Sequence, residues 1–148
     1  MDEGFINKNF SHFKIHSQYS ICEGALKIDD LSKYCKENKI KSIGLCDSYN
    51  LCGALEFAEK LSKIGTQPII GTQINFLFEN IIGKLPLFAT TETGYKNLTK
   101  LSSKSYLESD AKSNPHCKIT ELENINKDLI ILTGTINDFF GSLFKLNK

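Results

Sequence analysis

The stretch IGLCDSYNLCGALEFAEKLSKIGTQPIIGTQINF, residues 43–76, decides the fold. A short apolar run ends at Cys46 or Asp47, an amphipathic segment follows and stops at Gly65, and a second run rich in apolar residues begins directly afterwards. Because glycine commonly terminates helices, the middle segment is predicted as one helix between two strands. A strand–helix–strand unit of this kind predicts a parallel pair of strands with the helix packed outside them.

The same alternation continues on both sides of this stretch. The strand at residues 84–90 is expected to return beside residues 67–78 after a turn at 79–83, and residues 109–118 are expected to form a polar loop. These signals predict an α/β fold with mainly parallel strands and outer helices. We predict strands at residues 13–17, 41–47, 67–78, 84–90 and 128–134, and helices at residues 27–39, 50–65, 94–108 and 136–146.

Helical spacing of apolar residues predicts which face of each helix is buried. The expected faces are Ile28, Leu31 and Cys35 in the first helix, Leu51, Leu55, Ala58 and Leu61 in the second, and Ile136, Phe140, Leu143 and Phe144 in the last.

Length and composition indicate one soluble domain. A chain of 148 residues can bury a core of its own, and 41% hydrophobic with 24% charged residues is ordinary for a globular protein. No apolar run reaches the roughly 18 residues of a transmembrane helix, and the acidic, polar N-terminus does not resemble a secretory signal. The five cysteines form no CxxC pair, which favours reduced thiols in a cytoplasmic protein over a disulfide framework or a zinc finger.

The charge pattern argues against strong nucleic-acid binding by this segment alone. Its formal net charge is +1, and every basic residue is a lysine, so the bidentate guanidinium contacts typical of phosphate recognition cannot form. This composition favours a role in which any contact with DNA is made elsewhere.

Polar side chains at predicted strand ends are candidate site residues. His16, Asp47 and Gln73 each come at or near the end of a predicted strand, where sites form in parallel sheets. His12, Lys14 and His16 are two residues apart, so in a regular strand they would share one face. Two imidazoles on one face suggest a metal site, but the protonated lysine between them has no lone pair and repels a cation. Each strand-end residue could equally be a hydrogen-bonded structural residue.

Four stretches carry a resemblance that extends along essentially the whole chain. They are HFKIHSQYSICEGALKIDDL (12–31), IGLCDSYNLCGALEFAEKLSKIGTQPIIGTQINF (43–76), LFATTETGYKNLTKLSSKSYL (87–107) and DLIILTGTINDFFGSL (128–143). In this order they resemble the N-terminal PHP (polymerase and histidinol phosphatase) domain of bacterial replicative DNA polymerase III alpha subunits. The resemblance implies a distorted (β/α)₇ barrel, of which residues 1–148 would be the first, incomplete part.

The resemblance also implies where metal ligands would stand in family members that hold a multinuclear zinc or manganese site. Its first motif, His-x-His, aligns with Lys14 and His16, while His12 falls before it. Its second motif, Asp-His, aligns with Asp47 and Ser48. Three further ligand positions align with Gln73, Lys84 and Thr135.

Only His16 and Asp47 keep the chemistry of a ligand at these positions. Two ligands cannot hold a cluster of metal ions, and two lysines would add like charge to it, so the resemblance implies a degenerate metal site. We expect instead a structural polar cluster of His12, Lys14, His16 and Asp47, in which Lys14 pairs with Asp47, because buried charges need partners.

The expected role follows from this degenerate site. The segment is expected to be catalytically inactive, without a cofactor, and to serve as a structural and docking module for the polymerase core and the epsilon proofreading exonuclease within the replicase. DNA and magnesium would be bound by downstream polymerase domains. The alternative is a metal-dependent phosphoesterase or 3′–5′ exonuclease using zinc or manganese. A third hypothesis is a standalone enzyme with Cys46 as its nucleophile. It is disfavoured because buried strand cysteines are usually inert. No membrane partner is expected.

Overall fold

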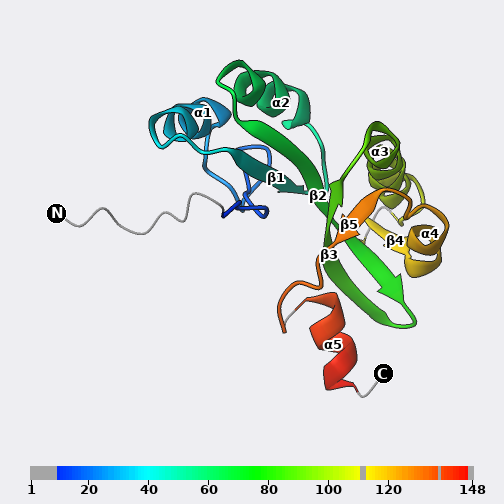
Figure 1. Ribbon diagram of the computed structural model, residues 1–148. Helices are drawn as coiled ribbons and strands as arrows, with labels where there is room; N and C mark the ends of the chain where they lie inside the picture. Colours follow the sequence, from blue (N-terminus) through cyan, green and yellow to red (C-terminus); the bar gives the residue numbers. More distant parts are fainter. Residues whose placement is uncertain (1–9, 111–112, 137, 147–148) are drawn as a thin grey trace.

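The computed structural model describes residues 10–110, 113–136 and 138–146 (Figure 1). The described part contains no helix that is both long and apolar enough to cross a membrane. Along the chain the elements are α1 (Ile28–Glu37), β1 (Ser42–Ser48), α2 (Ala54–Lys63), β2 (Gln67–Phe78), β3 (Ile81–Ala89), α3 (Glu92–Leu107), β4 (His116–Lys118), α4 (Ile119–Asn124), β5 (Leu129–Ile131) and α5 (Phe139–Lys145).

The long strand β2 organises a mixed sheet. It pairs in parallel with β1 and with β4, and antiparallel with β3, which in turn pairs antiparallel with β5. Since β3 overlaps the register of both parallel partners, β1 and β4 must lie end to end along the opposite edge of β2. The predicted α/β class and the return of β3 beside β2 are confirmed, while the sheet holds antiparallel as well as parallel pairings.

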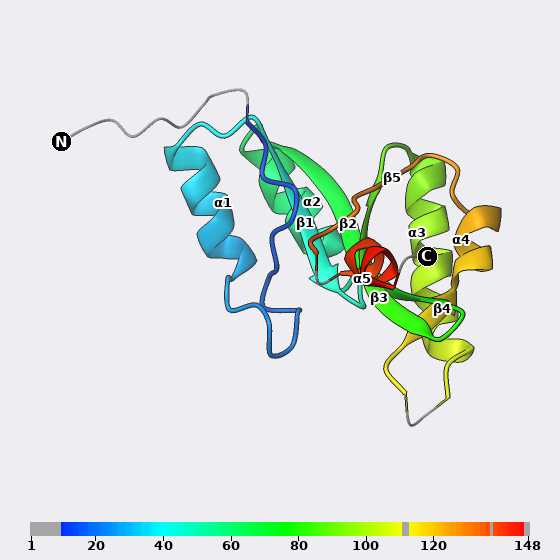
Figure 2. The same ribbon diagram turned by 90° about the horizontal axis from the view of Figure 1, so that it is seen from below.

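Two hydrophobic cores form on the helix-covered face of this sheet. Figures 1 and 2 show α1 and α2 at one end of the sheet and α3 and α4 at the other. The first core lies between α1, α2 and β1, and the second between β2, β3 and the later helices. The first contains Ile28, Leu31, Cys35, Ile43, Leu45, Phe57 and Leu61; the second contains Ile74, Phe76, Leu85, Leu87, Leu98, Leu101, Cys117, Leu122 and Phe139.

The helices of the first core follow the sequence signals with one correction. The three residues predicted to face inward from α1 are all buried. In α2 the buried face is Ala54, Phe57 and Leu61, and Leu55 is 71% exposed, because Phe57 is the largest apolar side chain of the helix and turns toward β1. The helix ends as predicted, with Gly65 in the left-handed region at φ +78°.

Two elements are absent from the sequence prediction. Residues 109–118, expected to form a loop, end in β4, and α4 follows at once. Both are short, but each contributes a buried side chain to the second core, Cys117 and Leu122. Elements of three and six residues carry too little periodicity to be recognised before their packing partners are known.

The predicted first strand is wrong as a regular strand. Residues 10–16 have no strand assignment, and Ser17 forms only an isolated parallel bridge to Leu26. The segment still lies beside β1, whose Gly44 and Cys46 amides donate to the carbonyls of His12 and Ile15. These acceptors are three residues apart, so the two-residue alternation of a strand is broken.

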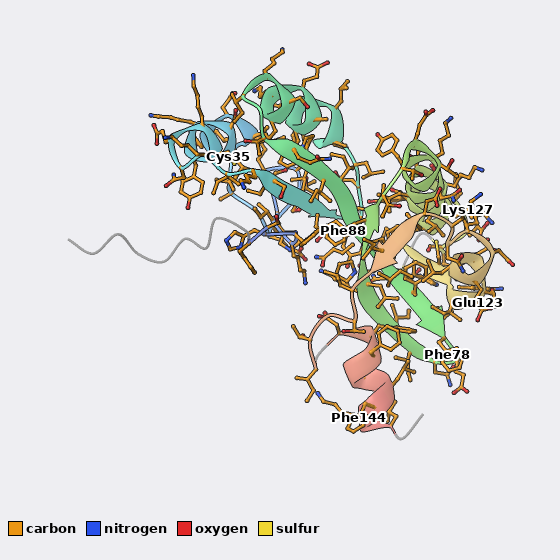
Figure 3. The ribbon with its side chains drawn as sticks, viewed as in Figure 1. Cys35, Phe78, Phe88, Glu123, Lys127 and Phe144 are labelled. Atoms are coloured by element: carbon orange, nitrogen blue, oxygen red, sulfur yellow. The ribbon has the colours of Figure 1, made fainter. Side chains whose placement is uncertain are left out.

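The last helix turns its buried side differently from the prediction. Phe139 is buried in the second core, whereas Phe140 is 44% and Phe144 80% exposed. Figure 3 shows Phe144 on α5 at the outside of the molecule, while Phe88 lies at the centre of the sheet. Predicted buried residues Ile136 and Phe140 are therefore surface residues in the described structure.

Candidate functional site

A loop at residues 17–26 brings the candidate site together. The Ser17–Leu26 bridge closes the loop, and Gly24 permits this closure because a Cβ there would lie 2.1 Å from the Ser17 carbonyl oxygen. The loop covers the C-terminal end of β1, and its residues contact Asp47, Ser48 and Gln73. This is the strand-end location that the sequence predicted for a site.

Asp47 anchors the base of this loop. Its side chain is almost completely buried and accepts hydrogen bonds from the Ser17 amide (2.6 Å), the Ser17 hydroxyl (2.7 Å) and the Ser20 hydroxyl (2.7 Å). Ser20 Oγ in turn accepts from the Ser48 amide at 3.0 Å. The carboxylate is thus stabilised by neutral donors rather than by a buried cation.

The expected ion pair between Lys14 and Asp47 is not formed among the described residues. Lys14 is exposed, and none of the ion pairs among the described residues includes it. His12 is also exposed and packs edge-on against Phe10 with ring centroids 4.7 Å apart. His16 alone stays near Asp47, with Nδ1 3.5 Å from Ser20 Oγ.

A second centre forms around Glu23 at the tip of the loop. One carboxylate oxygen accepts a hydrogen bond from the Ser48 hydroxyl and lies 3.4 Å from Gln73 Nε2; the other forms an ion pair with Lys84 Nζ at 2.5 Å. Gln73 Nε2 also donates to Ser48 Oγ at 2.6 Å. The structure therefore brings together three predicted ligand positions, from β1, β2 and β3, on a residue that the sequence did not single out.

The strand registers explain this convergence. Gln73 is aligned with Ser48 on β1, and Asn75, two residues further along β2, is aligned with Lys84 on β3. Side chains two residues apart share a face, so all four point away from the face that holds Ile74 and Phe76. The polar side chains are thus grouped on the face of the sheet opposite Ile74 and Phe76.

The ion pair shifts the pKa of both its partners. The hydrogen bond from Lys84, followed by that from Ser48, holds the pKa of Glu23 below its usual value. Partial burial acts to lower the pKa of Lys84, but its contacts with Glu23 and Tyr49 outweigh this and raise it. The Lys84 ammonium also lies 5.1 Å from the centre of the Tyr49 ring. Both groups are therefore charged at neutral pH.

The remaining candidates lie apart from Glu23 or lack reactivity. Thr135 is exposed between β5 and α5, and its amide donates to the Asp138 carboxylate at 2.6 Å. Burial raises the pKa of the Cys46 thiol to about 12, so a Cys46 nucleophile would be protonated at neutral pH.

The side chains at the candidate site do not suit a metal cluster. Within the described ranges, no group of three or more His, Cys, Asp or Glu residues could hold a metal ion. At the Glu23 centre the neighbours are a hydroxyl, an amide and an ammonium, and a lysine ammonium both repels a cation and lacks a free electron pair. The residues present do not fit a multinuclear site.

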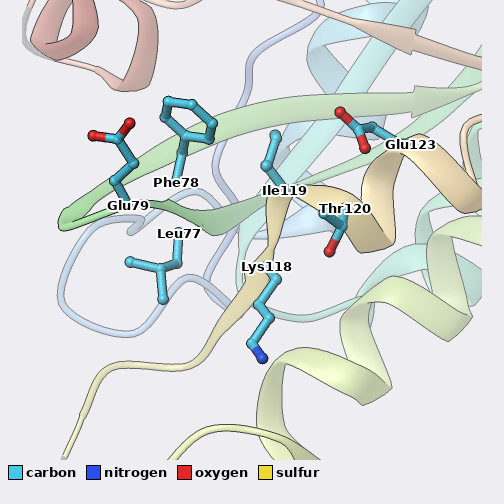
Figure 4. Close-up of a pocket in the computed structure, with 7 residues that line it drawn as sticks. All are labelled: Leu77, Phe78, Glu79, Lys118, Ile119, Thr120 and Glu123. Carbon is cyan, nitrogen blue, oxygen red and sulfur yellow. The ribbon is translucent and has the colours of Figure 1, made fainter.

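Two of the surface pockets formed by the described residues lie next to β2 and β3. An open polar pocket of about 540 Å³ lies beside the Glu23 centre and includes Tyr49, Asn75, Lys84, Asn114 and Asp138. Figure 4 shows the other, a mainly apolar groove of about 360 Å³ between the β2–β3 hairpin and the start of α4. Leu77, Phe78 and Ile119 line the second groove, which shares no lining residue with the first.

Sequence reasoning missed the loop residues Ser17, Ser20 and Glu23. A spacing of three residues, S-x-x-S-x-x-E, was visible, but nothing in it says that the loop folds back over a strand end about 30 residues later. The one available signal was that Ser48, Gln73 and Lys84 all carry hydrogen-bond donors. Donors grouped in this way favour a nearby acceptor such as a carboxylate.

Comparison with known proteins gives consistent matches. Residues 12–147 match the family described as PHP domain. DNA polymerase III subunit alpha from Buchnera aphidicola is 38% identical over 130 residues, covering 84% of this chain and 11% of that protein. The proteins of the same name from Rickettsia felis and Caulobacter vibrioides are 40% and 35% identical, covering 83% and 95% of this chain but 10% and 13% of their own length.

This chain thus spans about a tenth of the length of the curated relatives it matches. Among solved structures, an amidohydrolase from Chromobacterium violaceum aligns with a TM-score of 0.48 and 14% identity, over 64% of this chain and 34% of that one.

Proposed function

This chain belongs to the PHP domain family, and we propose that it forms the N-terminal segment of a replicative DNA polymerase alpha subunit. The proposal is supported by relatives of that name that match most of this chain at 35–40% identity. In this proposal residues 1–148 are the first part of a PHP barrel. Nucleotidyl transfer, with its magnesium ions and its DNA contacts, belongs to the remainder of the longer polymerase chain.

Within that protein, the segment has a degenerate metal site and acts as a structural module. The observation that carries this proposal is the convergence of Ser48, Gln73 and Lys84 on Glu23. Three of the positions at which the family resemblance implies metal ligands here form hydrogen bonds or an ion pair with Glu23. Such a network links three strands and a loop without an ion.

The docking part of the proposal rests on exposed apolar surface. Ile130 and Ile131 on β5, with Phe140 and Phe144 on α5, are all more than one-third exposed. Such a surface on a soluble protein commonly marks an interface. We assign it to the polymerase core, and we expect the epsilon proofreading exonuclease and other replicase subunits to assemble on the longer chain.

A metal and activity measurement on the full-length chain tests the proposal. Protein purified without chelator should contain well under one zinc or manganese ion attributable to this domain, counted against a variant lacking residues 1–148. A 5′-labelled oligonucleotide should not be shortened when zinc or manganese is added. Two or three bound ions, with hydrolysis that an Asp47→Asn change abolishes, would instead establish a metal-dependent phosphoesterase or 3′–5′ exonuclease.

Association with the exonuclease is measured separately. The full-length chain should retain the epsilon subunit in size-exclusion chromatography, and the chain lacking residues 1–148 should not. Equal retention of epsilon by both proteins would contradict a docking role for this segment.

A further inference from the structure

Among the described residues, the Glu23–Lys84 ion pair links the tip of the 17–26 loop to β3. Lys84 lies in the first half of β3, 61 residues after Glu23 in the chain. The base of the loop is fixed independently, by Asp47 and the serine hydroxyls. The loop is therefore held at two places of different chemistry: only neutral donors bond its base, whereas a cation joins the neutral Ser48 and Gln73 donors at its tip.

The surroundings of the Lys84 ammonium have the features of a site for a single positive charge. Glu23 provides a carboxylate at 2.5 Å, and the face of Tyr49 lies 5.1 Å away, a distance at which the ring quadrupole attracts a cation. The Lys84 side chain is 28% exposed, so solvent screens this charge only in part.

A buried amide beside the pair has an unused acceptor. Gln73 is 3% exposed, and its Oε1 has no hydrogen-bond partner among the described residues, while its Nε2 contacts Ser48 and Glu23. The Gln73 amide group thus directs its Nε2 donor toward Glu23 and Ser48. Because this donor is neutral, the Lys84 ammonium is the group that neutralises the charge of Glu23.

We propose that Lys84 is a built-in cation that does the structural work of a bound ion, holding Glu23 and through it the 17–26 loop against the ends of β1 and β2. This inference rests on the proposed degenerate site and extends it. The loop should then be ordered without any divalent metal, and its order should depend on the charge at position 84.

Removing the side chain creates a direct test by chemical rescue. In Lys84→Ala, a gap opens between Glu23 and Tyr49 that a small alkylammonium ion can enter with the same N–H donors. The readout is hydrogen–deuterium exchange of the amides of Glu23 and Gly24, which donate to the Ser20 carbonyl within the loop. The measurement is made on the full-length chain, with Lys100→Ala as the control, because Lys100 is an exposed lysine on α3, away from the loop.

We expect Lys84→Ala to speed exchange at Glu23 and Gly24 by between about threefold and tenfold, the effect of losing one partly screened charged hydrogen bond. Ethylammonium should restore slow exchange. Potassium at the same ionic strength and tetraethylammonium, which has no N–H donor, should not. Lys100→Ala should match the unmodified protein throughout.

Two results would overturn the proposal. One is unchanged loop exchange in Lys84→Ala, and the other is restoration by zinc or manganese but not by ethylammonium. If Lys84→Ala does not fold, Glu23→Gln removes the charge while keeping the shape, and it should loosen the loop to the same extent. If neither Lys84→Ala nor Glu23→Gln alters loop exchange in a protein that contains no metal, the built-in cation alone is refuted. Stoichiometric metal in the unmodified protein would instead refute the proposed function.

Discussion

Asp47 is a buried acid whose charge is balanced by hydrogen-bond donors rather than by a neighbouring lysine. The family resemblance implied ligand positions at Asp47, Ser48, Gln73 and Lys84, and in the structure the last three contact Glu23. The expected partner of Asp47 was wrong: Lys14 is exposed in a segment whose backbone loses the alternation of a strand, and serine donors bond the carboxylate instead.

Replacing Asp47 by Ala should lower the free energy of unfolding by about 2–4 kcal/mol, since the Ser17 amide and two hydroxyls lose their common acceptor. Urea denaturation of the two proteins measures the difference. Glu59→Ala, on the exposed side of α2, serves as the control and should change stability by less than about 0.5 kcal/mol.

Lys14→Met provides the discriminating comparison. With Lys14 exposed, this change should leave stability almost unaffected, and combining it with Asp47→Leu should not recover the loss caused by removing the carboxylate. Recovery in the double variant would mean that Lys14 and Asp47 form a buried pair after all.

Glu56 on α2 offers a pH-dependent prediction away from the site. Hydrogen bonds from Lys60, then from Tyr19, lower the pKa of Glu56. A carboxyl group whose pKa is lower in the folded than in the unfolded state stabilises the fold fully above the unfolded pKa, and this stabilisation is lost as pH falls through the folded pKa.

Tyr19→Phe removes one of these donors, because the Tyr19 hydroxyl bonds Glu56 at 2.9 Å. The pKa of Glu56 should therefore rise toward its ordinary value, which a carbon-detected NMR titration of glutamate carboxyls would show. Tyr34→Phe, with a half-exposed ring on α1, should leave that titration unchanged.

At the scale of elements, long segments were predictable and short ones were not. Residues 43–76 encode β1, α2 and β2 with apolar runs and a clear helix stop, and the structure confirms all three. The elements β4 and α4 arise from tertiary packing of Cys117 and Leu122, which no local pattern announces. The orientation of α2 also depends on packing. Phe57 is buried in the first core with the side chains of β1, and Leu55 is exposed.

Two phenylalanine-to-alanine changes on α5 can distinguish its buried face from its exposed face. Phe139→Ala should cost about 3–5 kcal/mol, because it removes a ring buried beside Gly83 in the second core. Phe144→Ala, 80% exposed on the same helix, should cost little. Thermal melts of the two variants check this, and equal losses would mean that α5 packs through the face predicted from the sequence.

At the scale of the whole molecule, the described sheet ends in an open edge. No described strand pairs with the outer side of β5, and Ile130, Ile131 and Leu132 are each at least 36% exposed. Open edges with apolar side chains promote association between chains. Whether residues 1–148 fold independently could not be deduced from sequence, because edge closure depends on contacts beyond any local pattern.

We expect the isolated 148 residues to be oligomeric or prone to aggregation, and the same residues within the full-length chain to remain soluble. Ile130→Lys should shift the isolated segment toward monomer in size-exclusion chromatography, since a charge on an edge strand opposes pairing. Ile21→Lys, an equally large change at an 85% exposed loop position, should not. A sharp monomer peak from the unmodified segment would show that the described domain is complete.

The strand β2 passes through both cores, and Thr72 stands at the boundary, fully buried and bonded to the Asp47 carbonyl oxygen at 2.6 Å. Before it, Ile70 packs on the first core; after it, Ile74 belongs to the second. Two cores that share one strand but few side chains melt as partly separate cooperative units. In scanning calorimetry of the segment in its monomeric Ile130→Lys form, the measured enthalpy should then exceed the van't Hoff enthalpy of the transition. Thr72→Val, which removes the hydroxyl at this boundary, should widen the gap between the two enthalpies.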